Sequence, residues 1–366
     1  LSRGDLPEGD DTASLRGMGL LLDGRHVEAA AEVTPALAEA GGDEPSVAAL
    51  AIAATAAIRS GRTDIARRHA DRGLEVKSED PAGGWMLVEL ACARWYADLD
   101  EGRLDEAEDL ATRAHARAIA DGRPGTVSLY ATWLGIVAAR RGRVRTAARW
   151  LLEAAAGVAA DRFLFTVPLV SELAIALTCL GQTARARSVF GEAGDLRVDG
   201  PVTGWSAATR VWLAGAVGHT TEAERIALEA AETAVAYSAR LAALHTAVRL
   251  GITGAVTDRL LALSTDVPGP VARLYAAHGQ ALAAQDGNAL DDVAERFATA
   301  GLVLHAAEAA AQAAVAHRAA GAPGSAGGSA SRARAWAEAC EGASTPSLAA
   351  RSVSLWATWW RRWTNS

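Results

Sequence analysis

One short phrase, in which an alanine follows a glycine by five positions, recurs along most of this chain and limits what it can fold into. Its clear copies read GRHVEA at Gly24, GRTDIA at Gly61, GRLDEA at Gly102, GRVRTA at Gly142, GQTARA at Gly181 and GHTTEA at Gly218. Their alanines are Ala29, Ala66, Ala107, Ala147, Ala186 and Ala223, and weaker copies begin at Gly251, Gly287 and Gly321. Successive copies lie roughly 33 to 41 residues apart, which is the repeat length of solenoids built from helix pairs.

The phrase itself predicts a tight turn between two helices. Runs rich in alanine and leucine, long enough for a helix, lie on both sides of each copy. A glycine just past a helix end supplies the left-handed cap that other residues reach only at a cost. The alanine would then lie on the first turn of the second helix, where a small side chain lets the two helices approach closely. Such a hairpin cannot bury its apolar face alone, so the sequence predicts a stack of them.

Changes in composition and periodicity divide the chain into three parts. Residues 1–14 are rich in Gly, Pro, Asp and Ser without periodicity, and we expect a linker there. Residues 15–342 form the predicted helical-repeat domain. Within its last hairpin, the low-complexity stretch GAPGSAGGSAS at 321–331 predicts a flexible loop. Residues 343–366 form a tryptophan-rich tail.

Composition excludes several classes of function. The chain has 366 residues and a net charge of −7, which disfavours a general nucleic-acid footprint. Three well-separated cysteines, Cys92, Cys179 and Cys340, fit buried thiols in a reducing cytoplasm, and no apolar run is long enough for a membrane span. The sequence contains no HExxH or GxSxG motif. We therefore predict a cytoplasmic, non-enzymatic protein with no metal, no cofactor and no catalytic residue.

The turns resemble those of a known repeat family. Small residues about seven positions before the glycine, such as Ala54, Gly135 and Ala174, together with the Gly-x-x-x-x-Ala phrase, are similar to tetratricopeptide repeats. The longer repeat units, and the segments at 297–321 and 332–348, resemble the C-terminal repeat region of large ATP-binding LuxR-type transcription regulators of actinobacteria. The resemblance covers roughly residues 15–348. It implies an all-α, right-handed superhelical α-solenoid of about eight to nine tetratricopeptide-like hairpins.

Two features of that regulator family are missing from this sequence. The only lysine, Lys77, lies outside any GxxxxGK[ST] motif, so no P-loop is present. After Pro346 the chain reads SLAARSVSLWATWWRRWTNS instead of the start of a helix-turn-helix domain. The resemblance therefore implies only the effector-responsive region, without its ATPase and helix-turn-helix domains, and no direct nucleic-acid binding by this chain.

Aromatic residues on the predicted first helices are candidates for a ligand-binding groove, because tetratricopeptide arrays hold peptides or small ligands with first-helix side chains. For any single residue, packing between helices is the favoured alternative, since large aromatic side chains mostly serve cores. The candidates are Trp85, Trp95, Tyr96, Tyr130, Trp133, Trp205, Trp212 and Tyr275.

Two charged or amphipathic segments have more than one interpretation. The arginines at one predicted turn form a basic patch that contacts phosphate or an acidic partner, or else pairs with the acidic stretch Asp98–Asp109. In the tail, four tryptophans at helical spacing predict a capping helix, an interfacial or partner-docking helix, or the product of a shifted reading frame. The arginines are Arg140, Arg141, Arg143, Arg145 and Arg149, and the tryptophans are Trp356, Trp359, Trp360 and Trp363.

The leading functional hypothesis is an interaction and sensing solenoid of a LuxR-type regulator, which binds a protein or small-molecule effector in its concave groove. The alternative is a stand-alone tetratricopeptide scaffold for protein–protein interactions, with no role at DNA. Self-association is left open as a further interaction. Nothing in the sequence supports an enzyme on a helical scaffold.

Overall fold

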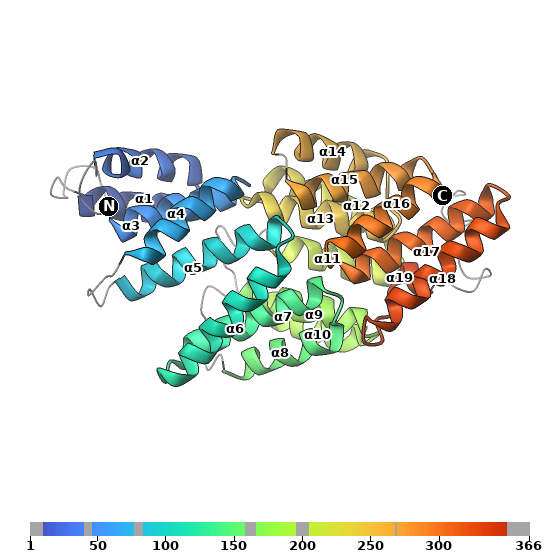
Figure 1. Cartoon of the computed structure of the whole chain (residues 1–366), viewed down its shortest axis with the longest axis horizontal. Coiled ribbons are helices and arrows are strands. Elements are labelled where there is room, and N and C mark those ends of the chain that lie inside the picture. The colour runs from blue at the N-terminus through green and yellow to red at the C-terminus, as the bar shows by residue number, and fades with distance from the viewer. Residues whose placement is uncertain are drawn as a thin grey trace.

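Helices joined by tight turns make up the computed structural model, which describes residues 10–39, 46–76, 83–157, 166–194, 205–267 and 269–349. No strand occurs in those ranges, so the predicted all-α repeat fold is confirmed (Figure 1). Nine hairpins follow one another there, the upper end of the predicted range. They are α1 (Asp10–Leu22) with α2 (His26–Glu39), α3 (Val47–Arg59) with α4 (Thr63–Glu75), α5 (Gly83–Asp100) with α6 (Leu104–Ala120), α7 (Pro124–Arg140) with α8 (Val144–Gly157), α9 (Thr166–Cys179) with α10 (Thr183–Gly194), α11 (Trp205–Ala216) with α12 (Thr220–Thr233), α13 (Tyr237–Arg249) with α14 (Ala255–Asp266), α15 (Pro270–Ala283) with α16 (Gly287–Thr299), and α17 (Val303–Ala319) with α18 (Pro323–Glu338). A short helix, α19 (Pro346–Ala349), comes last.

The repeated phrase forms the turn inside each hairpin, as predicted. The six clear glycines all have positive φ, from 75° at Gly61 to 84° at Gly218. At Gly61 the amide donates to Ile58 O at 3.0 Å and the next amide donates to Ala57 O at 2.8 Å, which satisfies the last carbonyls of α3. The alanines five positions later, from Ala29 to Ala223, are all completely buried. The weaker copy at Gly287 is different, because the left-handed residue of that turn is Gln285 and Gly287 begins α16.

Two predicted boundaries are wrong. Helix α1 begins at Asp10, so the predicted linker over 1–14 includes the first turn of a helix. The predicted flexible loop at 321–331 is largely helical, because α18 begins at Pro323, a residue preorganised for a helix start. Its small side chains lie against α17, and Ala326 and Ser329 are buried. The tail beyond residue 349, with its four tryptophans, lies outside the described residues.

The solenoid curls so that the turns of its first four hairpins meet residues of its C-terminal half. The glycine of each of these four turns approaches a residue roughly 160 to 210 positions further along the chain, in the same order as the repeats. The pairs are Gly24 with Val235, Gly61 with Tyr237 and Val267, Gly102 with Val271, and Gly142 with Leu304 and Cys340. We call this row of contacts the seam. Consistent with it, α13 contacts α3 and α15 contacts α5 (Figure 1).

The segment after α18 fastens the end of the seam. The carboxylate of Glu341 accepts hydrogen bonds from the amide and the hydroxyl of Thr146, both at 2.8 Å. The amide of Ser344 donates to Cys179 O at 2.6 Å. These bonds tie the last hairpin to hairpins four and five, and they bring residues far apart in the sequence around a common interior.

Candidate functional site

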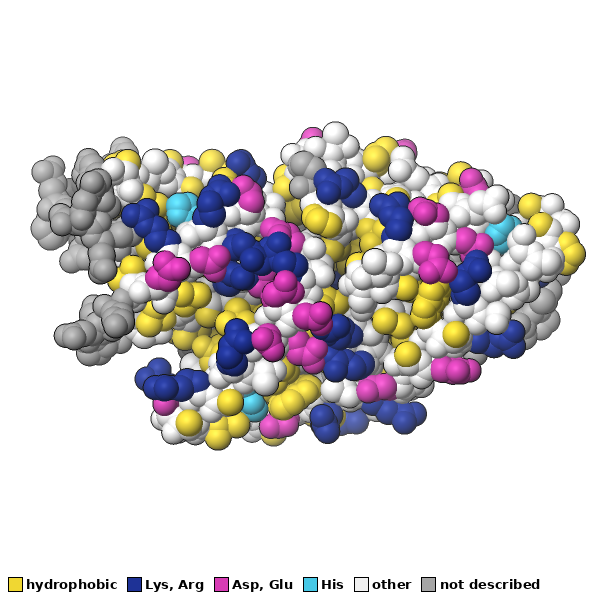
Figure 2. All heavy atoms as spheres, viewed as in Figure 1, with side chains coloured by type: hydrophobic (Ala, Val, Ile, Leu, Met, Phe, Trp, Pro, Cys, Tyr) yellow, Lys and Arg dark blue, Asp and Glu magenta, His cyan; other side chains and the backbone are white. Residues whose placement is uncertain are grey.

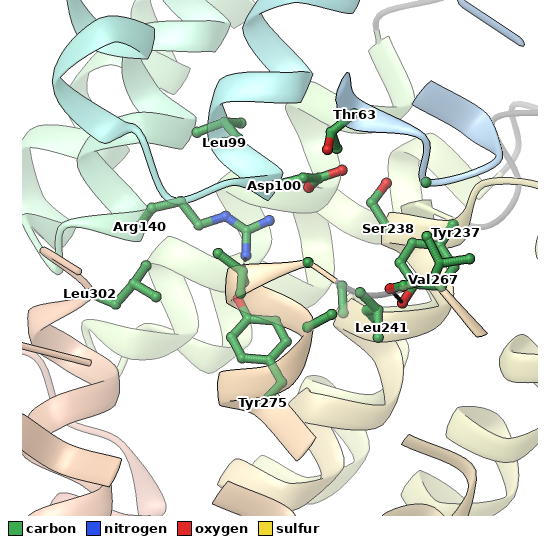
Figure 3. Close-up of a pocket in the computed structure, with 15 residues that line it drawn as sticks. Thr63, Leu99, Asp100, Arg140, Tyr237, Ser238, Leu241, Val267, Tyr275 and Leu302 are labelled. Carbon is green, nitrogen blue, oxygen red and sulfur yellow. Dashed lines mark hydrogen bonds between the residues drawn. The ribbon is translucent and has the colours of Figure 1, made fainter. Parts of the chain in front are cut away.

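Behind the seam lies a cavity with two lobes, which share Asp100 and Arg140. The first lobe is lined from the N-terminal side by Gly61, Thr63 and Leu99, and from the C-terminal side chiefly by Tyr237, Ser238, Leu241, Val267, Tyr275 and Leu302 (Figure 3). The second is lined by Tyr96, Leu99, Ile136, Glu172, Ile175, Ala208, Ser238, Ala239 and Ala242. The room for water-sized molecules is about 50 Å³ in the first lobe and about 30 Å³ in the second. We call both lobes together the central cavity.

Three charged side chains reach the central cavity from three successive first helices. Asp100 ends α5, Arg140 ends α7 and Glu172 lies on α9. The guanidinium of Arg140 projects into the cavity, and its Nη1 donates a long hydrogen bond of 3.4 Å to the hydroxyl of Tyr275 (Figure 3). Among the described residues, none of the three charged groups has an oppositely charged partner within 4 Å.

Burial controls the ionisation of these groups. It raises the pKa of Asp100 to about 7, against the attraction of Arg140, and it also raises the pKa of Glu172. Burial opposes the charge of Arg140 as well, but Tyr275, Glu172 and Asp100 together raise its pKa. Each side chain retains some contact with solvent, as expected for the wall of a cavity. The cavity thus contains one cation and two carboxyl groups that attract one another without forming a direct ion pair.

Among the predicted groove aromatics whose side chains are described, two line the central cavity. Tyr275 faces the first lobe, and Tyr96 faces the second. Trp95, Trp133 and Trp212 are at most 1% exposed and lie in the helix-packing core, which corrects their placement in the groove. Trp95 and Trp133 stack with their ring centroids 4.9 Å apart. Packing was the alternative for each residue, and it describes these three.

Two of the other predicted aromatics, Tyr130 and Trp85, lie outside the cavity lining. Tyr130 packs edge-on against Trp133 within the same core. Trp85 is half-buried near the start of α5. Trp205 begins α11, and its side chain is outside what the structure describes. Neither Tyr130 nor Trp85 is among the described residues that line the central cavity.

The predicted basic patch separates into an interior arginine and surface arginines. Arg140 points inward, whereas Arg141 pairs with Asp105 and Glu108, and Arg143 pairs with Glu108. The predicted alternative, pairing with the acidic stretch of the previous repeat, therefore describes Arg141 and Arg143. Arg145 is exposed. Figure 2 shows arginine and acidic side chains interspersed across the middle of one face.

Sequence reasoning missed Asp100 and Glu172, although part of the signal was present. The residue two positions before a turn glycine ends the first helix of its hairpin, and this position carries Asp100 and Arg140 at the cavity. The same position carries Arg249, which is buried and donates to Glu308 at 2.6 and 3.1 Å. Reading this position across the repeats would have singled out the interior charges. Glu172 lies two turns earlier in its helix and has no such marker.

Next to the cavity, a buried histidine cluster surrounds the Arg249–Glu308 pair. His245 stacks on Tyr275 at 3.6 Å, and one of its nitrogens lies 3.0 Å from His278. Burial lowers the pKa of His278 to about 4 and also lowers the pKa of His245 and His305. These rings are therefore neutral packing groups near pH 7.

Two further classes of site find no support within the described ranges. No group of three or more His, Cys, Asp or Glu side chains there is arranged to hold a metal ion. None of the helices described is both long and apolar enough to span a bilayer.

Comparisons with known proteins point to the fold. No protein-family model matches the chain, and no curated protein matches it in sequence. The structure of a Rap protein complexed with competence and sporulation factor has a TM-score of 0.62 at 11% identity, covering 90% of this chain and 98% of that one. The apo form of RapI has a TM-score of 0.51 at 12% identity, covering 75% and 97% respectively. At this level of identity the likeness shows a tetratricopeptide-like helical-repeat fold alone.

Proposed function

We propose that this chain is a non-catalytic interaction solenoid that binds a protein segment or a small effector in its central cavity. The observation that carries the proposal is Arg140, whose guanidinium enters the cavity without a carboxylate within 4 Å among the described residues. A largely buried charge without a direct ion-pair partner is costly, and a bound ligand supplies such a partner. The solved Rap complex, in which a protein of the same fold binds competence and sporulation factor, supports such a role for this fold.

A cavity-filling variant tests this proposal. Ligands are first selected with the wild-type chain as the target. They come from random peptides displayed on phage and from a panel of small metabolites screened by thermal shift. Ala242→Phe places a large side chain in both lobes, and we expect it to weaken the selected ligands by about tenfold or more. The matched control is Ala116→Phe, at an exposed alanine on α6, which should leave affinity unchanged. If neither screen yields a ligand that is sensitive to Ala242→Phe, the proposal is wrong.

We further propose that the solenoid belongs to a LuxR-type regulator, on the strength of residues 297–348. In this segment the phrase CEGASTP, at 340–346, contacts hairpins four and five through Glu341 and Ser344. Next to it, the hydroxyl of Ser347 donates to Arg249 O at 2.7 Å, near the central cavity. A domain attached after this segment would therefore sense the state of the seam. In this proposal the protein is cytoplasmic, which suits its three buried free thiols.

The stand-alone scaffold is the competing proposal, and the DNA on either side of the coding segment separates the two. A P-loop region upstream together with a helix-turn-helix in any downstream frame supports the regulator. Finding neither supports the scaffold.

A further inference from the structure

The central cavity carries charges of both signs in one small space. Asp100, Arg140 and Glu172 all line its second lobe. A purely cationic ligand would be repelled by Arg140, and a purely anionic one by the two carboxylates. A ligand that carries both an ammonium and a carboxylate gives each of the three groups an oppositely charged neighbour. The mixed charge pattern therefore favours a zwitterion.

The size of the cavity limits the ligand further. About 10 to 15 Å³ of such space holds one water molecule, so the two lobes hold only a few waters each. Allowing for their shared wall, that room suits about five to eight non-hydrogen atoms. A peptide is much larger, so only one of its ends or side chains would enter this space. Free α-amino acids with small side chains have this size.

The remaining walls suit the rest of such a molecule. The hydroxyls of Tyr275 and Ser238 lie beside Arg140 and Asp100 in the first lobe (Figure 3). Ile136, Ile175 and Ala208 line the second lobe and offer an apolar surface for a short aliphatic side chain. Few polar groups with fixed positions in an otherwise apolar pocket are typical of small-molecule sites.

We propose that the central cavity binds a free α-amino acid with a small side chain, its carboxylate on Arg140 and its ammonium between Asp100 and Glu172. This assignment rests on the proposed function, because it names the effector of the same cavity. It requires both charged ends of the ligand, since each end answers a different side chain. An amino acid blocked at either end should therefore bind poorly.

The test is a thermal-shift screen of the whole chain with each of the twenty L-amino acids at about 10 mM, followed by calorimetry on any that bind. We expect one or more small amino acids to raise the melting temperature by about 2 °C. The N-acetyl derivative and the amide of the same amino acid should each bind about tenfold more weakly, because each lacks one charge. No stabilising amino acid, or equal binding of the blocked derivatives, overturns the proposal.

Variants assign the two ends of the ligand. Arg140→Gln should abolish the difference between the amino acid and its amide, and Asp100→Asn with Glu172→Gln should abolish the difference from the N-acetyl form. Asp258→Asn, at an exposed carboxylate on α14 outside both lobes, is the matched control and should retain full binding. Thermal unfolding of each variant without ligand checks that it is folded. Unchanged discrimination in the folded cavity variants overturns the assignment.

The outcomes separate this inference from the proposed function. If peptides or other metabolites bind in a manner sensitive to Ala242→Phe while no free amino acid does, the amino-acid assignment fails and the interaction role stands. If nothing binds in the cavity, both fail.

Discussion

Two groups of turns in this solenoid share one sequence phrase and one backbone conformation, but they have different surroundings. Gly61 and Gly142 have φ of 75° and 80°, and a side chain at either would meet atoms across the seam within 2.7 to 2.8 Å. Gly181 and Gly321 have φ of 75° and 72°, and a side chain there would meet nothing within 4 Å. We call them docked and free turns. Glycine is required for backbone conformation in both groups, and for close approach only in the first.

At two turns of the seam the residue two positions before the glycine lines the central cavity, whereas at Gly24, another turn of the seam, it is the exposed Leu22. At the docked turns of Gly102 and Gly142 it is Asp100 or Arg140, and both reach the central cavity. At the free turn of Gly181 it is the buried Cys179. At Gly102 and Gly142, docking therefore closes the solenoid and also encloses the charged end of a first helix in the central cavity. The seam and the cavity are two consequences of one contact.

The largest effect is expected on the C-terminal side of the seam, at the Arg249–Glu308 pair. Glu308 is completely buried on α17, one helical turn after Leu304, which Gly142 approaches. Glu308→Ala removes the carboxylate that pairs with the buried guanidinium of Arg249, which then keeps the ring of Trp212, its centroid 4.4 Å away, as a neighbour but has lost its anionic partner. We expect a loss of about 3–5 kcal/mol in the free energy of unfolding, measured with urea.

Glu229→Ala provides the control for that variant. Glu229 belongs to an exposed pair with Arg225 on α12, so its removal should cost less than about 1 kcal/mol. Similar costs for the two variants would show that the C-terminal side of the seam does not depend on the buried Arg249–Glu308 pair.

Next in size is the comparison of Gly142→Ala with Gly181→Ala. At Gly142 the new Cβ would lie 2.8 Å from Cys340 Sγ and 3.0 Å from the amide nitrogen of Leu304. The added overpacking and the positive φ together predict a loss of about 2–4 kcal/mol. Gly181→Ala also places an alanine at a positive φ, but its Cβ would meet no atom within 4 Å, so it should cost about 1 kcal/mol. Equal urea midpoints for the two variants would contradict the distinction between docked and free turns.

At Asp100 we expect a smaller effect, and it is a gain in stability instead of a loss. Its pKa is raised to about 7 in the folded chain, so between about pH 4 and pH 7 the unfolded state loses a proton that the folded state keeps. Stability therefore falls as pH rises through this range, and Asp100→Asn removes the loss. Because the side chain retains solvent contact, we expect a gain of about 1–2 kcal/mol at pH 8 and little change near pH 4.

Urea unfolding at both pH values checks this, with Asp258→Asn, at an exposed carboxylate outside the cavity, measured alongside as the control. A destabilised Asp100→Asn at pH 8 would indicate that the ionised carboxylate is already compensated in the closed chain.

Local rules were enough to predict the repeat architecture. The glycine fixes a left-handed turn, the alanine fixes close packing of two helices, and both requirements act within a few residues, so the sequence displays them. The flexible loop predicted at 321–331 failed because glycine and serine were interpreted by composition. In α18 these small residues are tolerated in a helix that lies close against α17.

The central cavity could not be predicted in the same way, because it depends on where the solenoid closes. Tyr96 and Tyr275 lie about half the chain apart, and only the seam brings their two sides together. Aromatic character was a poor guide, since a tryptophan such as Trp95 fills the core as readily as it lines a groove. Charged residues near a turn were the better signal, because burying a charge costs free energy and so indicates a specific role.

The smallest expected effect decides what kind of contact holds the seam. Arg141 lies near Gly301 across the seam, but its own ion pairs are with Asp105 and Glu108 of the previous repeat. If close packing holds the seam, Arg141→Ala should cost less than about 1 kcal/mol and the cost should fade in high salt, as for Arg225→Ala at an exposed site away from it. Urea unfolding at low and high salt measures this. A cost larger than that of Gly142→Ala would mean that charge, and not the missing side chain of glycine, distinguishes docked turns from free ones.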